Sequence, residues 1–256
     1  MGGHLEKVDD LLVVLGSCLA FSLVQLGLGR LFPKQKMFEV EWRAPESVNK
    51  LICAFHALLI SGLTWRALLL SPFAIWSSEG WGAPFGHEAK RAAQVCLGYF
   101  MFDTVYSVWE QSFDMVVHHL VIISGLVVSL SEDISAKEMM MGTAVMEIST
   151  PFLHCRHFTR ATINTKGLSL HDLSSYGFAL SFFVCRILLA PFISYWAVVT
   201  LQNPVCVKIG AVAVQVLSFW WFWKLVQVIR RTLQGNGNER PKRDPKKHLD
   251  FVSKVQ

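Results

Sequence analysis

Apolar residues fill this chain in long, recurring runs, and polar residues are largely confined to short segments between them. Seven runs approach the about 20 residues that an α-helix needs to cross the hydrocarbon core of a bilayer. We therefore predict membrane-spanning helices over residues 11–32, 48–72, 93–109, 114–130, 138–155, 174–200 and 205–229. The third to fifth runs are short or interrupted by polar residues, so six spans are the alternative count. The pattern predicts an all-α membrane protein.

Composition agrees with a chain that lies mostly in a membrane. Charged residues make up 17% of the 256 residues and the mean hydropathy is +0.39, whereas soluble domains carry about 25% charged residues. The six cysteines lie within or at the ends of the predicted spans and show no Cys-x-x-Cys spacing, so we expect reduced, small core residues. The formal charge of +5 comes mainly from loops and the C-terminal segment, and we expect no nucleic-acid partner.

Basic residues gather in three segments that seven spans would place on one side of the membrane, namely 30–50, 156–173 and the stretch after Arg230. The excess of Lys and Arg on cytoplasmic loops predicts a cytosolic C-terminus and an N-terminus on the opposite side. The predicted organisation is an N-terminal transmembrane anchor and basic loop over 1–40, a helical membrane domain over 41–232, and a disordered basic cytosolic tail over 233–256.

Ionisable side chains interrupt five of the apolar runs. Each such group costs at least about 2.5 kcal/mol inside the hydrocarbon core, so these groups usually face a cavity or one another. Counted at about 1.5 Å per residue from the cytosolic end of each span, all of them lie in the same half of the bilayer. We expect one shared cavity that opens to the cytosol. Its predicted members are His56, Asp103, His118, His119, Glu147 and Arg186.

Two of these spans carry their polar residues on a single face. A polar stripe on an otherwise apolar helix faces protein or water rather than lipid. The stripes are Tyr99, Asp103, Tyr106 and Glu110 in the third span, and Thr143, Glu147, Thr150 and His154 in the fifth.

Two prolines are expected to release backbone carbonyls beside these charged groups. Proline has no N–H, so Pro151 deprives the carbonyl of Glu147, four residues earlier, of its helical partner. Pro191 is expected to do the same to the carbonyl of Ile187, next to Arg186. Freed backbone of this kind is tolerated within a membrane where it lines a protein cavity.

The adjacent pair His118–His119 suggests acyl-transfer chemistry. A buried neutral imidazole is both a nucleophile and a general base, and a nearby carboxylate such as Asp103 fixes its tautomer. Arg186 could hold a carboxylate, phosphate or thioester group. Two alternatives stay open. The histidines could only bridge helices by hydrogen bonds, or they could bind a metal together with the pair His154 and His157.

Five ordered pieces of the chain resemble the TLC-domain family, which includes the ceramide synthases and their non-synthase relatives. The pieces lie between about residue 40 and residue 230. They are Asn49-Lys50-Leu51 through His56-Ala57, Gly98-Tyr99-Phe100-Met101-Phe102-Asp103, the His118–His119 pair, Met146-Glu147-Ile148-Ser149-Thr150-Pro151-Phe152, and Cys185-Arg186-Ile187-Leu188-Leu189-Ala190-Pro191-Phe192.

The resemblance implies six helices in a barrel-like bundle around a lipid cavity, in the membrane of the endoplasmic reticulum or a related compartment such as the Golgi or plasma membrane. In ceramide synthases it further implies transfer of a fatty acyl group from acyl-CoA to the amine of a sphingoid base, without a bound cofactor. The residues carried over as catalytic are His118, His119 and Asp103, and those expected to bind substrate are Arg186, Glu147, His56, Tyr99 and Tyr106.

One departure from the ceramide synthase pattern keeps a second function open. Ceramide synthases follow the histidine pair with two aspartates and a Leu-Glu in the next helix, whereas here Glu147 stands alone, followed by Ser-Thr-Pro-Phe. That form is closer to smaller TLC-domain proteins, some of which regulate phospholipid composition. We therefore predict either a ceramide-synthase-like N-acyltransferase or a non-catalytic lipid-binding regulator. Expected partners are membrane lipids, acyl-CoA and a sphingoid base, and a second copy of the chain in a homodimer.

Overall fold

A computed structural model describes residues 2–31, 34–37, 40–159 and 168–235 of the chain. The elements run in the order α1 (Gly2–Leu31), β1 (Lys34–Met37), β2 (Val40–Arg43), α2 (Ala44–Leu69), α3 (His87–Trp109), α4 (Phe113–Glu132), α5 (Ala136–Met146), η1 (Glu147–Ser149), α6 (Thr150–Phe158), α7 (Leu170–Phe182), η3 (Phe183–Leu189), α8 (Ala190–Val199) and α9 (Val205–Gly235). The expected tail is helical up to Gly235, and its remainder, 236–256, lies outside the described residues.

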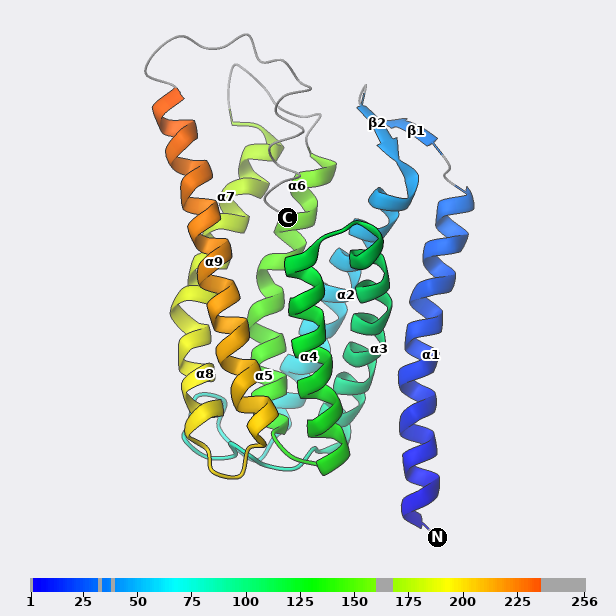
Figure 1. Ribbon diagram of the computed structural model, residues 1–256, viewed down its shortest axis with the longest axis vertical. Coiled ribbons are helices and arrows are strands. Elements are labelled where there is room, and N and C mark those ends of the chain that lie inside the picture. The colour runs from blue at the N-terminus through cyan, green and yellow to red at the C-terminus, as the bar shows by residue number, and fades with distance from the viewer. Residues whose placement is uncertain (1, 32–33, 38–39, 160–167, 236–256) are drawn as a thin grey trace.

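Long helices run roughly parallel to one another through the whole molecule (Figure 1). Five segments in the described part of the chain are long and apolar enough to cross a membrane: Val8–Leu31, Glu46–Leu70, Phe113–Glu132, Leu170–Val199 and Val205–Arg231. The other two predicted spans are present as α3 and as the continuous run α5–η1–α6, both lined with buried polar side chains. The prediction of an all-α membrane protein is confirmed.

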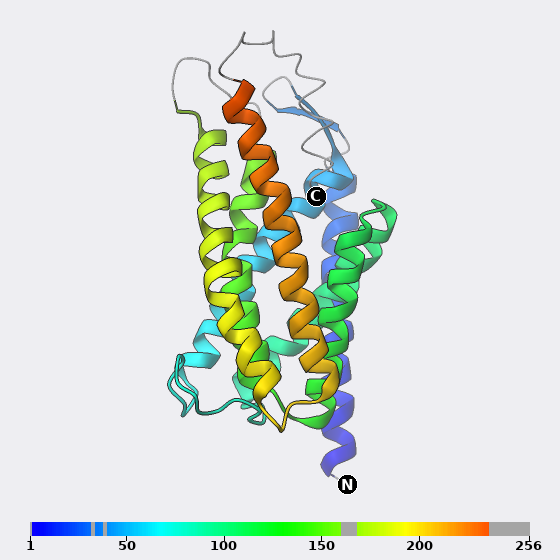
Figure 2. The same cartoon turned by 60° about the vertical axis from the view of Figure 1, so that its left-hand side comes forward.

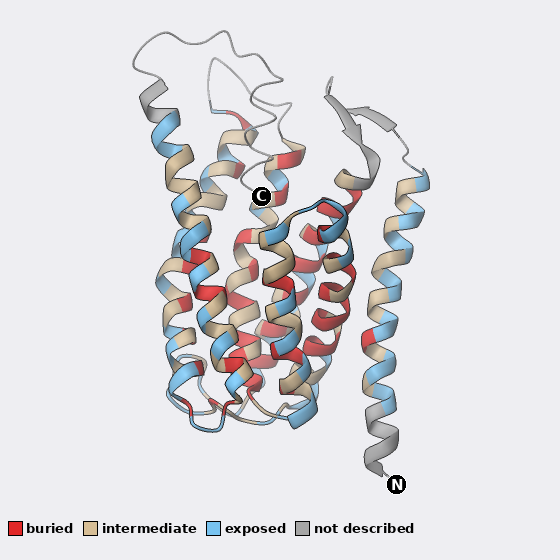
Figure 3. Cartoon of the chain, viewed as in Figure 1, coloured by how far each residue is buried: buried red, intermediate tan, exposed pale blue. Residues whose placement is uncertain are grey.

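Exposed and buried positions occur along most helices (Figure 3), and many of the exposed ones carry large apolar side chains, as expected for a bundle in lipid. Large apolar side chains point outward along the helices, with Leu58 63% and Leu180 66% exposed, while Asn49 and Gln94 are buried. Exposed apolar residues on spanning helices face hydrocarbon, and the polar residues are kept inside.

The N-terminal helix α1 stands at the edge of the bundle (Figures 1 and 2). It packs on α3 and more lightly on α2, so most of its surface is exposed. The remaining helices surround a common interior. A short antiparallel hairpin of β1 and β2, with Lys34 opposite Arg43, follows α1 and was expected only as a basic loop. We refer to the end of the bundle that carries it as the hairpin end, and to the opposite end, where α1 begins, as the N-terminal end (Figure 1).

Polar contacts close the N-terminal end. The Lys137 ammonium donates to three backbone carbonyls of the loop over 70–86, at 3.0, 3.1 and 2.5 Å. Beside it, the Glu138 carboxylate accepts hydrogen bonds from the Gly82 amide and the Asn203 side chain, both at 2.7 Å. These two residues at the start of α5 therefore tie the loops of this end together.

Candidate functional site

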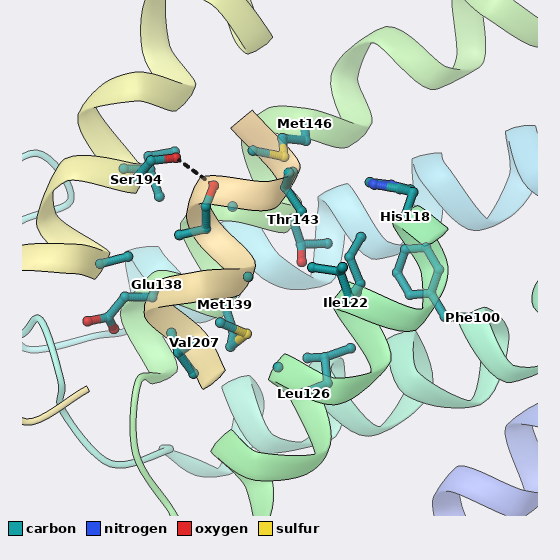
Figure 4. A pocket seen from close by; sticks show the side chains of 18 of the residues that line it. Phe100, His118, Ile122, Leu126, Glu138, Met139, Thr143, Met146, Ser194 and Val207 are labelled. Atoms are coloured by element: carbon teal, nitrogen blue, oxygen red, sulfur yellow. Dashed lines mark hydrogen bonds between the residues drawn. The ribbon is translucent and has the colours of Figure 1, made fainter. Parts of the chain in front are cut away.

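Two adjoining cavities lie between the helices of the described part of the chain. The polar chamber, about 200 Å³, extends toward the hairpin end as far as Lys50, Ser112 and His157. The apolar chamber, about 110 Å³, lies between α4, α5, α8 and α9 and extends toward the N-terminal end. Figure 4 shows Leu126, Met139 and Val207 toward one side of it and His118 toward the other. Four residues, which we call the junction residues, line both chambers: Phe100, His118, Glu147 and Arg186.

The polar chamber brings together seven of the eight residues predicted from the sequence. They come from α3, α4, η1 and η3, and they are Tyr99, Asp103, Tyr106, His118, His119, Glu147 and Arg186. The eighth, His56, lines neither of these chambers. It lies stacked on Tyr99 with ring centroids 3.5 Å apart, and neither of its ring nitrogens has a hydrogen-bond partner among the described residues. The roles of all eight residues stay predictions.

A histidine–carboxylate pair forms the centre of the polar chamber. His119 Nε2 lies 3.5 Å from Asp103 Oδ2, and both residues are buried. The Tyr99 hydroxyl donates to the same carboxylate oxygen at 3.0 Å, and the Asn49 amide donates to the other at 3.3 Å. On the far side of the imidazole, Ser107 Oγ lies 3.5 Å from His119 Nδ1. A buried carboxylate that is hydrogen-bonded on both oxygens can hold the imidazole in one orientation.

His118 faces the junction of the two chambers instead. Its Nδ1 is buried and has no hydrogen-bond partner in the described part of the chain. The ring meets Trp221 of α9 edge to face, with centroids 5.2 Å apart. An unpaired buried nitrogen is costly unless a ligand completes it, so His118 is placed to meet a polar group of a bound molecule.

Arg186 lies beside His118 and is only partly hydrogen-bonded. Its Nη2 donates to the Met146 carbonyl at 3.1 Å, while Nε and Nη1 are buried without partners among the described residues. The guanidinium lies 5.4 Å from the ring of Phe182 and 5.7 Å from that of Trp221. The N–H groups on these two nitrogen atoms provide donors for the oxygens of a carboxylate, phosphate or thioester.

The backbone around Glu147 differs from the prediction. The Glu147 carbonyl accepts a hydrogen bond from the Thr150 amide in a tight 3₁₀ turn, so Pro151 does not leave it free. The prediction was wrong because it assumed an uninterrupted α-helix. The turn instead exposes the Met146 carbonyl, which receives the Arg186 guanidinium.

A second change of helical register accompanies Pro191. Residues Phe183–Leu189 form a π-helical segment, in which the Ala190 amide bonds to the carbonyl five residues earlier. In this register Pro191 deprives Arg186, rather than Ile187, of an amide partner. The Arg186 carbonyl accepts a hydrogen bond from the Gln215 side chain at 3.1 Å instead.

Trp221 is a site residue that the sequence did not reveal. The run from Phe219 to Trp223 has the composition of an interfacial aromatic belt, and Trp220 and Trp223 are exposed. Trp221, however, turns into the polar chamber, where its Nε1 donates to Asp114 at 3.0 Å. Lys224 donates to the same carboxylate oxygen at 3.1 Å. The period of a helix could have indicated that one aromatic of the run points inward.

His154 and His157, considered above as metal ligands, line the polar chamber near the hairpin end. Within the described ranges, no group of three or more His, Cys, Asp or Glu side chains is arranged to hold a metal ion.

Together these features define a class of protein: a multi-pass helical membrane protein with two adjoining internal cavities, one lined by polar side chains and the other apolar. Comparison with known proteins makes the class specific. Residues 46–227 match the family model of the TLC domain, and the chain belongs to that family. The resemblance noted in the sequence is confirmed.

Two curated relatives cover most of the chain. The chain is 25% identical over 266 residues to TLC domain-containing protein 4-A of Xenopus laevis, covering 93% of this chain and 99% of the relative. It is also 25% identical over 215 residues to TLC domain-containing protein 4-B of Danio rerio, covering 78% and 79% of the two chains. Family membership links this membrane protein to lipid biology.

Proposed function

We propose that this protein is an N-acyltransferase that moves a fatty acyl group from acyl-CoA to the amine of a sphingoid base. Acyl-CoA and the base would occupy the two chambers. By analogy with the ceramide synthases, the protein would act in the endoplasmic reticulum membrane. Its products would be ceramide-like sphingolipids.

One observation carries the proposal: the polar chamber that holds the His119–Asp103 pair adjoins the apolar chamber, and the four junction residues line both. From His118 to Leu126 the apolar chamber runs about 12 Å along α4, at the rise of a regular helix. An acyl chain lying there would present its carbonyl group at the junction, with the histidine pair beside it.

The chemical step then follows from the geometry of the side chains. With Nε2–H directed to Asp103, the Nδ1 atom of His119, which lies 3.5 Å from Ser107 Oγ, would act as the general base. The amine nitrogen attacks the thioester carbonyl carbon, so a C–N bond forms and the C–S bond breaks. His119 takes the proton that the amine loses and returns it to the leaving thiolate. His118 and Arg186 donate to the carbonyl oxygen as negative charge develops on it.

The alternative is a protein that binds lipid and regulates membrane composition without turnover. It is favoured by the lone Glu147, which departs from the ceramide synthase pattern. Both relatives are named after the domain alone.

The test uses the full chain in lipid nanodiscs, with radiolabelled acyl-CoA and sphinganine and a ceramide synthase as positive control. We expect labelled N-acyl product, abolished in His119→Ala and retained in His87→Ala, which lies at the start of α3, outside both chambers. Label that binds in the cavity but reaches neither product nor protein would support the regulator. A native protein that neither binds nor transfers the labelled acyl group would contradict both functions.

A further inference from the structure

The helix α1 lies outside residues 46–227, which match the family, yet it approaches the site closely. It does so at Gly98 of α3. A Cβ atom at Gly98 would lie 2.5 Å from the Val14 carbonyl oxygen and 2.7 Å from Cβ of Ser17. No real side chain tolerates those separations, so the backbones of the two helices meet at this glycine. Small residues allow such close approach between membrane helices.

A second contact fixes α1 nearer the N-terminal end. Asp10 forms an ion pair with Lys90 at 2.8 Å and accepts a hydrogen bond from the buried Gln94 amide at 2.7 Å. Gln94 and Gly98 stand one turn apart on α3, so both contacts involve the same face. Two separate contacts on one face set the rotation and the height of α1 against α3.

This arrangement places Phe21 against the aromatic wall behind the site. Its ring meets the edge of Tyr99 at 5.3 Å between centroids and that of His56 at 5.9 Å. Tyr99 is in turn stacked face to face on His56, with an interplanar angle of 7°. Tyr99 is thus held by His56 on its face and by Phe21 at its edge, and its hydroxyl reaches Asp103.

We propose that Phe21 is a positioning residue for the histidine–carboxylate pair. By fixing the Tyr99 ring, it directs the phenolic O–H to Asp103 Oδ2, the oxygen that also faces His119. The N-terminal helix then contributes to the geometry of the site in addition to anchoring the protein in the membrane. The inference rests on the proposed function only in taking His119 as the base of the reaction.

The central variant is Phe21→Ala, with Phe21→Tyr as the conservative replacement that keeps the ring. Leu23→Ala is the matched control, because Leu23 lies two residues on in the same helix and is 58% exposed. We expect Phe21→Ala to lower kcat about tenfold with little change in KM, as loss of an aromatic contact at the site would. Phe21→Tyr is expected to restore kcat, and Leu23→Ala to match the native protein.

A second readout does not depend on turnover. Diethyl pyrocarbonate modifies neutral histidine, and mass spectrometry can follow the rate at His119 against that at His87 in the same molecule. We expect the ratio to change by threefold or more in Phe21→Ala and to stay constant in Leu23→Ala. If Phe21→Ala lowers the yield of folded protein, Phe21→Leu replaces it, since Leu removes the ring and keeps most of the volume.

Gly98→Ala provides an independent test, because the new methyl group must displace α1. Gly16→Ala, where an added Cβ meets no atom within 4 Å, is its control. Native-like kcat and His119 modification in both Phe21→Ala and Gly98→Ala would overturn the inference while leaving the proposed transfer intact. A changed His119 rate in a protein that makes no product would instead retain the positioning role and reject the transferase.

Discussion

The two ends of the bundle use the same kinds of buried polar residue in opposite ways. At the N-terminal end, Lys137 and Glu138 are tied to loop carbonyls, an amide and Asn203, all within 3.1 Å. In the polar chamber, Arg186 and His118 keep buried nitrogen atoms that no described residue satisfies. One oxygen of Glu138 is also buried without a partner among the described residues, so the contrast is clearest for Lys137. Because unsatisfied buried groups are costly, we take the bonded Lys137 to stabilise the fold and the free nitrogen atoms of Arg186 and His118, which line both chambers, to be kept for a ligand. Structural and ligand-binding roles are separated by hydrogen bonding together with position at a cavity, because His56 is unpaired and lines neither chamber.

The largest effect is expected from Asp103→Asn, which keeps the shape of the side chain and removes its charge. The amide can no longer fix the His119 tautomer, so kcat for acyl transfer should fall about a thousandfold or more. Binding of labelled acyl lipid should change little. Asp172→Asn, in the capping box at the start of α7, is the matched control. Retention of a tenth of native activity in Asp103→Asn would remove this carboxylate from the mechanism.

Arg186→Met should separate binding from stability. Loss of the charged donors is expected to weaken the affinity for an acyl-CoA about a hundredfold, within the range of charge-assisted hydrogen bonds. The Tm should fall by less than it does in Lys137→Met, because the buried Glu147 carboxyl and the Met146 carbonyl lose a cation that is only partly hydrogen-bonded. Arg66→Met, at an exposed ion pair with Glu88, serves as the control. A large fall in Tm with unchanged affinity would reverse our assignment of the two ends.

Lys137→Met should give the opposite result. Three carbonyls of the loop over 70–86 lose their donor, and we expect a loss of about 2 kcal/mol in the free energy of unfolding. Transfer activity per folded molecule should not change, since Lys137 lines neither chamber. Thermal unfolding in detergent, compared with Lys208→Met at the same end, measures the effect. A native Tm would contradict a structural role for this lysine.

The smallest effect concerns Asp114, which holds Trp221 over the polar chamber. Asp114→Asn keeps an acceptor for the indole and removes the charge that pairs with Lys224. Because this ion pair is partly exposed, we expect only about a twofold to threefold rise in KM, with kcat unchanged. Trp221→Leu should have the larger effect on KM, and equal values for the two variants would indicate that the indole has no contact with the ligand.

The sequence predicts most of the charged and histidine side chains that meet in the polar chamber. Apolar run length located the spans, and the energetic cost of Asp103 or Arg186 in hydrocarbon required them to face inward. It could not locate the changes of helical register at Glu147–Ser149 and Phe183–Leu189, because these depend on tertiary hydrogen bonds to Arg186 and Gln215. For the same reason the freed carbonyls were misassigned by one residue.

Side-chain direction was the other limit. His56 lies at the expected depth but packs behind Tyr99. Trp221 faces the polar chamber, whereas its neighbours Trp220 and Trp223 are exposed. The depth of a residue within a span follows from counting residues, whereas the direction of its side chain around the helix axis is set by neighbouring helices. The saturated contacts of Lys137 depend on the path of the loop over 70–86, which carries no periodic signal.

The π-helical turn at Phe183–Leu189 has a consequence for how this span can change. A π turn accommodates one residue more than the α-helix around it. Winding the same seven residues as a regular α-helix, without a deletion, would rotate α7 by about 100° against α8. The span would keep its sequence and apolar character, yet Arg186 and Phe182 would no longer face the same interior. Such a change in the cavity would leave the hydropathy profile of the chain unchanged.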